Sequence, residues 1–192
     1  MCIRDRGIAA DITTLAKGLG AGYQPIAALM AAENVIRIIK NGSGTLWNGH
    51  TYMSHAIATA GALAVQQVIE EENLLTDVRT RGEQLRKGLQ TRLSQNPHVG
   101  NIRGRGLFWT VELVQDRTTK QPFDATLGLA PKVREIALDL GLMCYPSQGC
   151  ADGTQGDHVL LAPAYTSTRK EIETICDLIT QAIETALTGL EA

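Results

Sequence analysis

The chain has 192 residues, of which 44% are hydrophobic and 20% charged, a composition that indicates a globular protein and excludes a disordered or fibrous one. Its formal net charge is -2 and its lysines and arginines are spread along the chain, so no basic patch for a nucleic-acid partner is expected. No apolar run is long enough to cross a membrane, and four cysteines without CxxC spacing favour a cytoplasmic location over a secreted disulfide framework.

The first six residues, MCIRDR, stand apart from the rest of the chain. They carry two arginines and no apolar segment, so they do not form a secretory signal. The hexapeptide resembles translated sequencing adapter, which recurs at the start of genes from metagenomic assemblies. We therefore expect residues 1–6 to be a non-native leader and the natural sequence to continue from Gly7.

Hydrophobic periodicity predicts the elements of the first half of the chain. Residues 8–15 have the apolar and β-branched side chains of a buried strand. The pattern then predicts a short strand at 26–30, a helix at 32–40, an alanine-rich helix from its N-cap Ser54 to Glu72, and a leucine-striped helix that ends at Asn96-Pro97.

Beyond Pro97 short strands and helices alternate. Strands are predicted at 99–102, 107–114, 142–145 and 158–162, and helices at 131–140, opened by Pro131, and at 168–187. This order is typical of an α+β module with two layers. We expect two domains, residues 7–95 and 96–192, with the division inside the helix that ends near Asn96.

Three groups of residues suggest chemistry but are better explained without it. They are Gly18, Gly20 and Gly22 for a dinucleotide, Cys150, Asp152 and His158 for a metal, and Arg103 with Arg105 for an anion. The glycines lack the GxGxxG spacing. The second group lacks a further Cys or His at ligand spacing, so no metal site is predicted. Paired arginines in a turn are usually solvated, although two guanidinium groups can clamp an anion.

Lys17 has a neighbourhood that suits amine chemistry. It follows the end of the predicted strand, and glycines occupy alternate positions after it. A lysine at the carboxyl end of a buried strand loses part of its hydration, which favours the neutral amine that forms Schiff bases. The glycines would let a bulky aldehyde cofactor approach the backbone. The spacing alone does not distinguish this role from that of an exposed lysine at a strand end.

Two longer motifs carry a family resemblance that decides between these roles. DITTLAKGLGAGYQPIAALM, residues 11–30, resembles the lysine segment of the class III aminotransferases, pyridoxal-phosphate enzymes of fold type I that act on ω-amino acids and amines. NGHTYMSHAIATAGALAV, residues 48–65, is similar to the Gly-x-Thr-Tyr phosphate loop of that family and the helix after it. GNIRGRGLFWTVELV and GDHVLLAPAYTST resemble strands of its small domain.

The resemblance implies an α/β fold in which residues 7–95 are the C-terminal part of the large, cofactor-binding domain and residues 96–192 are the small α+β domain. Lys17 would hold pyridoxal phosphate as a Schiff base and serve as the general base. The amino group would pass from an amine or ω-amino acid to a 2-oxo acid, pyruvate or 2-oxoglutarate, in ping-pong order.

Other residues receive roles from the same resemblance. Thr51 would bind the cofactor phosphate in the active site of the neighbouring subunit, which implies a homodimer. His50 would bind the cofactor beside it, and Trp47 and Tyr23 would form walls of the substrate pocket. Neither a metal nor a nucleic acid nor a membrane is implied as a partner.

The chain also departs from the family pattern. Relatives specific for α-carboxylates or ornithine often carry an arginine where this chain has Leu160. An α-carboxylate would therefore need another partner, such as an arginine from the missing part, or the donor is an amine or ω-amino acid. The aspartate, the aromatic ring and the Gly-rich loop that contact the cofactor lie upstream of the lysine in such enzymes and are not found here. We expect an inactive fragment of an aminotransferase. An aminomutase or decarboxylase of the same fold, a non-catalytic interaction module and a truncated gene model remain alternatives.

Overall fold

The computed structural model describes residues 7–190, so the leader expected at residues 1–6 lies outside the described part. The chain divides into two compact units between Glu72 and Asn73. The sequence places this division near Asn96, and the difference concerns the leucine-striped helix. That helix packs with the second unit because Leu85, Leu89 and Leu93 are buried in the core of that unit.

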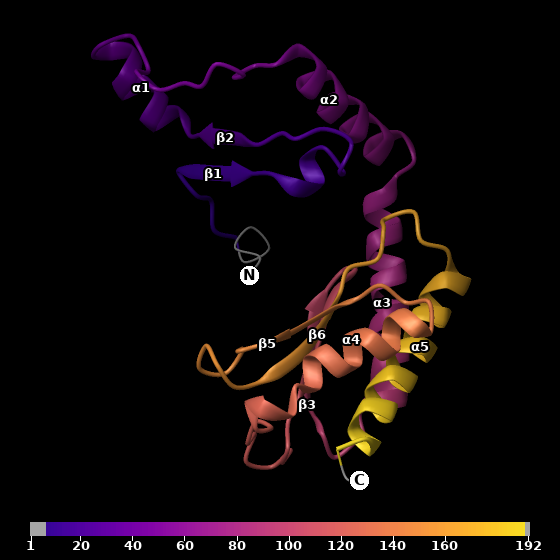
Figure 1. The fold of residues 1–192 in the computed structure, drawn as a ribbon. Coiled ribbons are helices and arrows are strands. Elements are labelled where there is room, and N and C mark those ends of the chain that lie inside the picture. Colours follow the sequence, from indigo (N-terminus) through magenta and orange to yellow (C-terminus); the bar gives the residue numbers. More distant parts are fainter. Residues whose placement is uncertain (1–6, 191–192) are drawn as a thin grey trace. The chain divides into compact units, whose positions relative to one another are not determined.

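The first unit contains a two-stranded sheet and two helices (Figure 1). β1 (Ile12–Leu15) pairs antiparallel with β2 (Ala28–Ala31), and the short 3-10 helix η2 (Lys17–Leu19) follows β1. α1 (Glu33–Asn41) begins just after β2, and α2 (Ala56–Glu71) follows a long loop. Asp11 fastens α1 to the sheet, because its backbone oxygen accepts from Ala32 N–H at 2.8 Å and its carboxylate accepts from the Asn34 amide at 3.0 Å.

Most apolar side chains of the first unit are exposed. Among its described residues, only Ala58 and Ala62 are buried hydrophobic ones. Ile12 is 54% exposed and residues 8–11 form no strand, so the prediction of a buried strand over residues 8–15 is wrong. The physical reason is that β2 offers four residues for pairing, and no other strand described in the chain joins this pair.

The second unit is an antiparallel sheet with helices on one face (Figure 1). The strand order is β3 (Val99–Arg105), β4 (Phe108–Leu113), β6 (Asp157–Leu161) and β5 (Tyr145–Gln148). The helices are α3 (Leu74–Leu93), the short η3 (Ala125–Leu127), α4 (Leu129–Asp139) and α5 (Arg169–Thr188). This arrangement confirms the α+β two-layer module.

The core of the second unit lies between the sheet and its helices. Alternate residues of the two central strands face the helices and are buried, as the period of two in a strand requires. They meet the buried stripes of α3 and α5, and the main participants are Val111, Leu113, Val159, Leu161, Leu85, Leu89, Ile172, Ile179 and Ile183. A capping box begins α5, in which the Thr168 hydroxyl accepts from Glu171 N–H and the Glu171 carboxylate accepts from Thr168 N–H.

Two elements of the second unit begin elsewhere than predicted. α4 starts at Leu129, two residues before Pro131, because the buried Asp157 carboxylate accepts from Ala130 N–H at 3.0 Å in its first turn. Burial raises the pKa of the Asp157 carboxyl above its usual range, although this hydrogen bond opposes the shift. β5 begins at Tyr145, where it pairs with Leu160, so the strand predicted at 142–145 is displaced.

Candidate active site

Lys17 stands at the junction between β1 and η2. Its backbone has a φ of 52°, a left-handed conformation that residues other than glycine seldom adopt. The turn after it is closed by hydrogen bonds from Leu19 N–H to Ala16 O at 3.1 Å and from Gly20 N–H to Lys17 O at 3.2 Å. The side chain is exposed, and its amine has no hydrogen-bond or ion-pair partner within residues 7–190. Local backbone strain therefore presents a free amine at the end of a strand.

The turn after Lys17 is fixed by close packing around Gly20. This glycine is buried, and a Cβ at its position would lie 2.7 Å from the backbone oxygen of Gln24 and 2.9 Å from Cγ2 of Ile26. From α2, the amide of Gln66 donates to the backbone oxygen of Leu19 at 3.5 Å. Only a residue without a side chain fits at Gly20, so the glycine-rich stretch serves the backbone of this turn.

Replacing Gly20 with alanine is expected to loosen the turn that carries Lys17. Because the added methyl group would meet the backbone of Gln24, the turn has to shift, and the hydrogen bond from Tyr23 N–H to Gly20 O, now 2.9 Å, weakens. We expect the Tyr23 amide to exchange with deuterium about tenfold faster, which follows from an overpacking cost of roughly 1–3 kcal/mol. Gly18→Ala is the matched control because a Cβ there has no neighbour within 4 Å. Equal exchange in both variants would contradict this account.

The loop before α2 carries the other residues predicted for the site. Trp47, His50 and Thr51 are exposed, and Trp47 is 89% accessible to solvent. A turn follows His50, whose backbone oxygen accepts from Met53 N–H at 2.9 Å. No hydrogen bond joins Lys17 to His50 or to Thr51 among the described residues. Each side chain is thus presented separately to solvent, as is Tyr23, which is 79% exposed.

Sequence reasoning missed two residues that support this region. His55 is the N-cap of α2, with Nδ1 accepting from Ala58 N–H at 3.4 Å, so the prediction of Ser54 as the cap is wrong. Ser54 lies in the turn before the helix with a φ of 58°. An imidazole nitrogen here accepts the hydrogen bond from the first turn of the helix that a hydroxyl or carboxylate oxygen usually accepts. Gln66 was missed because nothing in the sequence of a mostly apolar helix indicates which polar side chain reaches a distant turn.

The other candidate groups are explained by local structure. Within residues 7–190 no group of three or more His, Cys, Asp or Glu side chains could hold a metal ion. Asp152 accepts instead from the backbone amides of Thr154 and Gln155, and Arg103 pairs with Glu112 at 2.8 Å. None of the helices in the described part is both long and apolar enough to span a membrane.

Comparison with known proteins identifies the family. The model of the family described as aminotransferase class-III matches residues 1–183. The chain belongs to the class III aminotransferases. The match includes both motifs that carried the resemblance, so Lys17 and Thr51 lie inside the family region. Pyridoxal phosphate is the cofactor that membership of this family implies.

Individual class III relatives agree with this assignment. An aminotransferase of Gibberella zeae is 44% identical over 94% of this chain, which covers 36% of that protein. A transaminase structure from the marine bacterium Virgibacillus has a TM-score of 0.91 at 32% identity and matches 98% of this chain and 42% of its own. The PLP-bound structure of an amine transaminase from an uncultivated Pseudomonas species has a TM-score of 0.81 at 34% identity, covering 95% of this chain and 39% of its own.

The residues of this chain fit the cofactor of the class III family. The Lys17 amine has no partner within the described residues, and a Cβ at the next position, Gly18, would meet nothing within 4 Å. The backbone next to Lys17 therefore leaves open space at Gly18. The Thr51 hydroxyl is exposed in the loop before α2. An amine and a hydroxyl are groups that could hold an aldehyde and a phosphate, and neither contact requires a metal.

Proposed function

We propose that this chain is part of a pyridoxal-phosphate-dependent aminotransferase that moves an amino group from an amine or ω-amino acid to a 2-oxo acid, pyruvate or 2-oxoglutarate. The observation that carries this proposal is the free amine of Lys17, which has left-handed backbone two residues after the end of β1 and lies inside the region that matches the family. The chain spans 36% to 42% of the length of the relatives given above, so the activity is proposed for the longer protein.

Lys17 has two tasks in the proposed reaction. When bound, pyridoxal phosphate supplies an aldehyde that accepts amines and a ring that stabilises negative charge on the adjoining carbon. Lys17 Nζ holds the aldehyde until the donor amine replaces it. The released Lys17 amine then takes the proton from the substrate carbon that carries the amino group and delivers it to the former aldehyde carbon of the cofactor. The same group acts in reverse for the acceptor, which enters after the first product leaves, so the kinetics are ping-pong.

Thr51 and His50 are proposed to bind the phosphate end of the cofactor. A threonine hydroxyl and adjacent backbone N–H groups bind phosphate through short, fixed donors. We propose that they serve the site of a second copy of the chain in a homodimer. This arrangement is consistent with the absence of a hydrogen bond between Lys17 and Thr51 in the described part of one chain. Trp47 and Tyr23 are proposed to close the substrate pocket.

A neutral row on the second unit supports an amine or ω-amino acid as the donor. Leu160 lies directly opposite Thr110 on β4 and Tyr145 on β5, so these three share the sheet face away from the core. Arg103 is opposite Thr110 on the same face, but its guanidinium is bound to Glu112. Leu160 thus stands without a free cation where relatives specific for α-carboxylates often carry an arginine, which favours a donor without an α-carboxylate.

We also propose that the isolated 192-residue chain is inactive. The first unit leaves Ile12, Leu29 and Trp47 largely exposed, as expected if other residues cover them in the working enzyme. An aspartate at the pyridine nitrogen, which such enzymes place upstream of the lysine, is needed for the ring to accept charge. We therefore expect function only when the chain is joined to the remainder of the enzyme.

Reductive labelling tests the central assignment. The protein, with its upstream sequence restored, is incubated with pyridoxal phosphate, reduced with borohydride and mapped by peptide mass. We expect the label on Lys17, and none in Lys17→Ala, because only an amine that forms a Schiff base is trapped. Lys40→Ala is the matched control, since Lys40 is an exposed lysine of the same unit that pairs with Glu33 at 3.7 Å. Absence of label from Lys17 would refute the assignment. The same treatment of the 192-residue chain alone tests whether labelling of Lys17 depends on the upstream sequence.

A further inference from the structure

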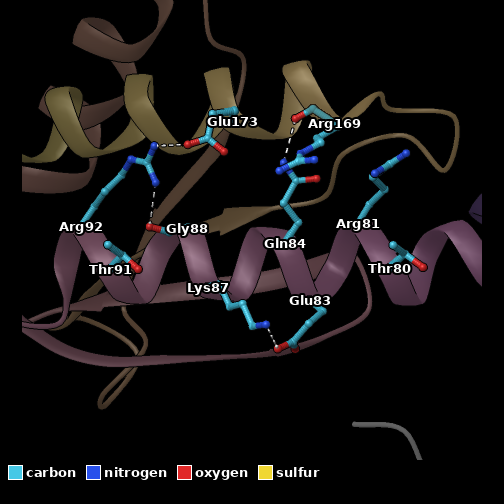
Figure 2. A pocket seen from close by; sticks show the side chains of 10 residues that line it. All are labelled: Thr80, Arg81, Glu83, Gln84, Lys87, Gly88, Thr91, Arg92, Arg169 and Glu173. Carbon is cyan, nitrogen blue, oxygen red and sulfur yellow. Dashed lines mark hydrogen bonds and ion pairs between the residues drawn. The ribbon is translucent and has the colours of Figure 1, made fainter.

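A groove runs between α3 and the first turns of α5 in the second unit, on the outside of the helical layer (Figure 2). Its volume is about 530 Å³. Its lining residues are Thr80, Arg81, Glu83, Gln84, Lys87, Gly88, Thr91, Arg92, Arg169 and Glu173. On α3 they extend from Thr80 to Arg92, which is about 18 Å at the rise of an α-helix. The groove is therefore elongated, and all of its lining residues except Gly88 have polar or charged side chains, whose aliphatic parts form much of its surface.

The acidic side chains of the groove are already neutralised. Glu83 pairs with Arg86 at 2.5 Å and with Lys87 at 3.7 Å. Glu173 pairs with Arg92 at 2.5 Å, and Arg92 also binds Asp177 outside the groove. The contacts with Arg86 and Lys87 hold the pKa of the Glu83 carboxyl below its usual value. No acidic side chain of the lining remains available for a further cation.

Two arginines of the groove are left without a partner. Arg81 on α3 and Arg169 on α5 line the same end of the groove, and neither guanidinium has an ion pair or hydrogen bond with any described residue. Figure 2 shows the Arg169 side chain beside Gln84, and the Arg81 side chain extending from α3 further along the groove, away from Gln84. Two free guanidinium groups at one end of a groove provide forked donors for carboxylates.

Gln84 adds an unmet acceptor beside Arg169. Its Nε2 donates to the backbone oxygen of Arg169 at 2.8 Å, which fixes the orientation of the amide. Its Oε1 is buried and has no hydrogen-bond partner. A buried acceptor without a donor is costly, and a ligand N–H relieves that cost when the Gln84 amide turns this oxygen towards the groove. Acidic groups and an N–H donor in one ligand are the properties of a polypeptide with acidic side chains.

We propose that this groove binds an extended acidic segment of another polypeptide, with carboxylates at Arg81 and Arg169 and a backbone N–H at Gln84 Oε1. A groove of this length holds about five extended residues at 3.3 Å each. A single phosphate would occupy a small part of the volume and would bind one end only. The proposal concerns the second unit alone and does not depend on the aminotransferase reaction.

The test measures fluorescence anisotropy of a labelled pentapeptide, Asp-Glu-Asp-Glu-Asp, with the 192-residue chain. We expect saturable binding that weakens with salt, because the arginines are accessible to solvent. Arg81→Ala and Arg169→Ala should each weaken binding about tenfold, since each removes a charged hydrogen bond. The double variant Arg37→Ala with Arg134→Ala removes two positive charges, one more than either single variant, from exposed positions outside the groove and should leave the affinity within about twofold.

Three outcomes would overturn the proposal. One is the absence of saturable binding to a chain whose near-ultraviolet spectrum shows a packed Trp109. Another is an equal loss of affinity in the control double variant, which would indicate attraction by net charge only. The third is competition by inorganic tripolyphosphate at the affinity of the peptide with the same dependence on both arginines, which would indicate a general anion site. The double variant Arg81→Glu with Arg169→Glu should bind a pentalysine peptide in place of the acidic one. Because this gain of binding requires a folded groove, it distinguishes the loss of the arginines from a loss of folding.

Discussion

Replacing Gly82 with alanine is expected to lower the free energy of unfolding of the second unit by about 3 kcal/mol, from overpacking plus one weakened hydrogen bond. In α3, a Cβ at this position would lie 2.1 Å from the backbone oxygen of Gly106 in the turn between β3 and β4. That oxygen also accepts from the Trp109 indole N–H at 2.7 Å. At Gly82 the helix therefore contacts the hairpin backbone to backbone, and the higher helix propensity of alanine, about 1 kcal/mol, does not offset the displacement.

Two other positions on α3 show that contact, rather than helix propensity, decides the effect. Thr91→Ala changes an exposed residue and should alter the unfolding free energy by less than about 0.5 kcal/mol. At Gly88 a Cβ would lie 2.5 Å from Sγ of Cys176, a side-chain atom. Cys176→Ala should therefore rescue Gly88→Ala but not Gly82→Ala. Urea unfolding followed through Trp109 measures all of these variants, and a fully stable Gly82→Ala protein would refute the contact.

The sequence predicted the second unit better than the first because that unit carries its own core. The leucine stripe of α3 and the isoleucine stripe of α5 have helical period and are buried in the structure, as their pattern predicts. The capping box at the start of α5 is also a local signal, since it needs only residues that lie three apart, although the helix at 168–187 was predicted from its isoleucine stripe. The contact between Gly82 and Gly106 depends on how the helix crosses the hairpin and has no local signal.

The first unit shows where such reasoning fails. An apolar, β-branched segment is buried only when something covers it. Residues 8–15 are exposed except for Thr13 and Leu15, which are half-buried, because the described chain provides one partner strand. The position of Lys17 after that strand was nevertheless predicted, because glycines and the end of an apolar run mark the same point in the chain. The proposed acidic-peptide groove could not be predicted from sequence, since Arg81 and Arg169 meet only through the packing of α3 on α5.

Mixing two inactive variants of the full-length enzyme is expected to restore activity if Thr51 serves the neighbouring subunit. Lys17→Ala alone should lose amino-group transfer by on the order of 10³-fold or more, because it removes the general base and the covalent anchor. Thr51→Ala should be severely impaired at limiting cofactor, because a phosphate donor is lost. When the two variants are unfolded together and reassembled, half of the dimers are hybrids by statistics, and each hybrid has one site with both native residues.

The rate of the reassembled mixture then separates the two arrangements of the site. If Lys17 and Thr51 come from different chains, about a quarter of the sites are native, and the mixture should reach about a quarter of the wild-type rate. If both residues serve the site of their own chain, each hybrid site carries one substitution and the rate stays at the mean of the two variants. A mixture prepared without reassembly provides the control and should stay at that mean in either case. Activity at the mean after reassembly would show that Thr51 acts within its own subunit, and the proposed exchange across a homodimer would be wrong.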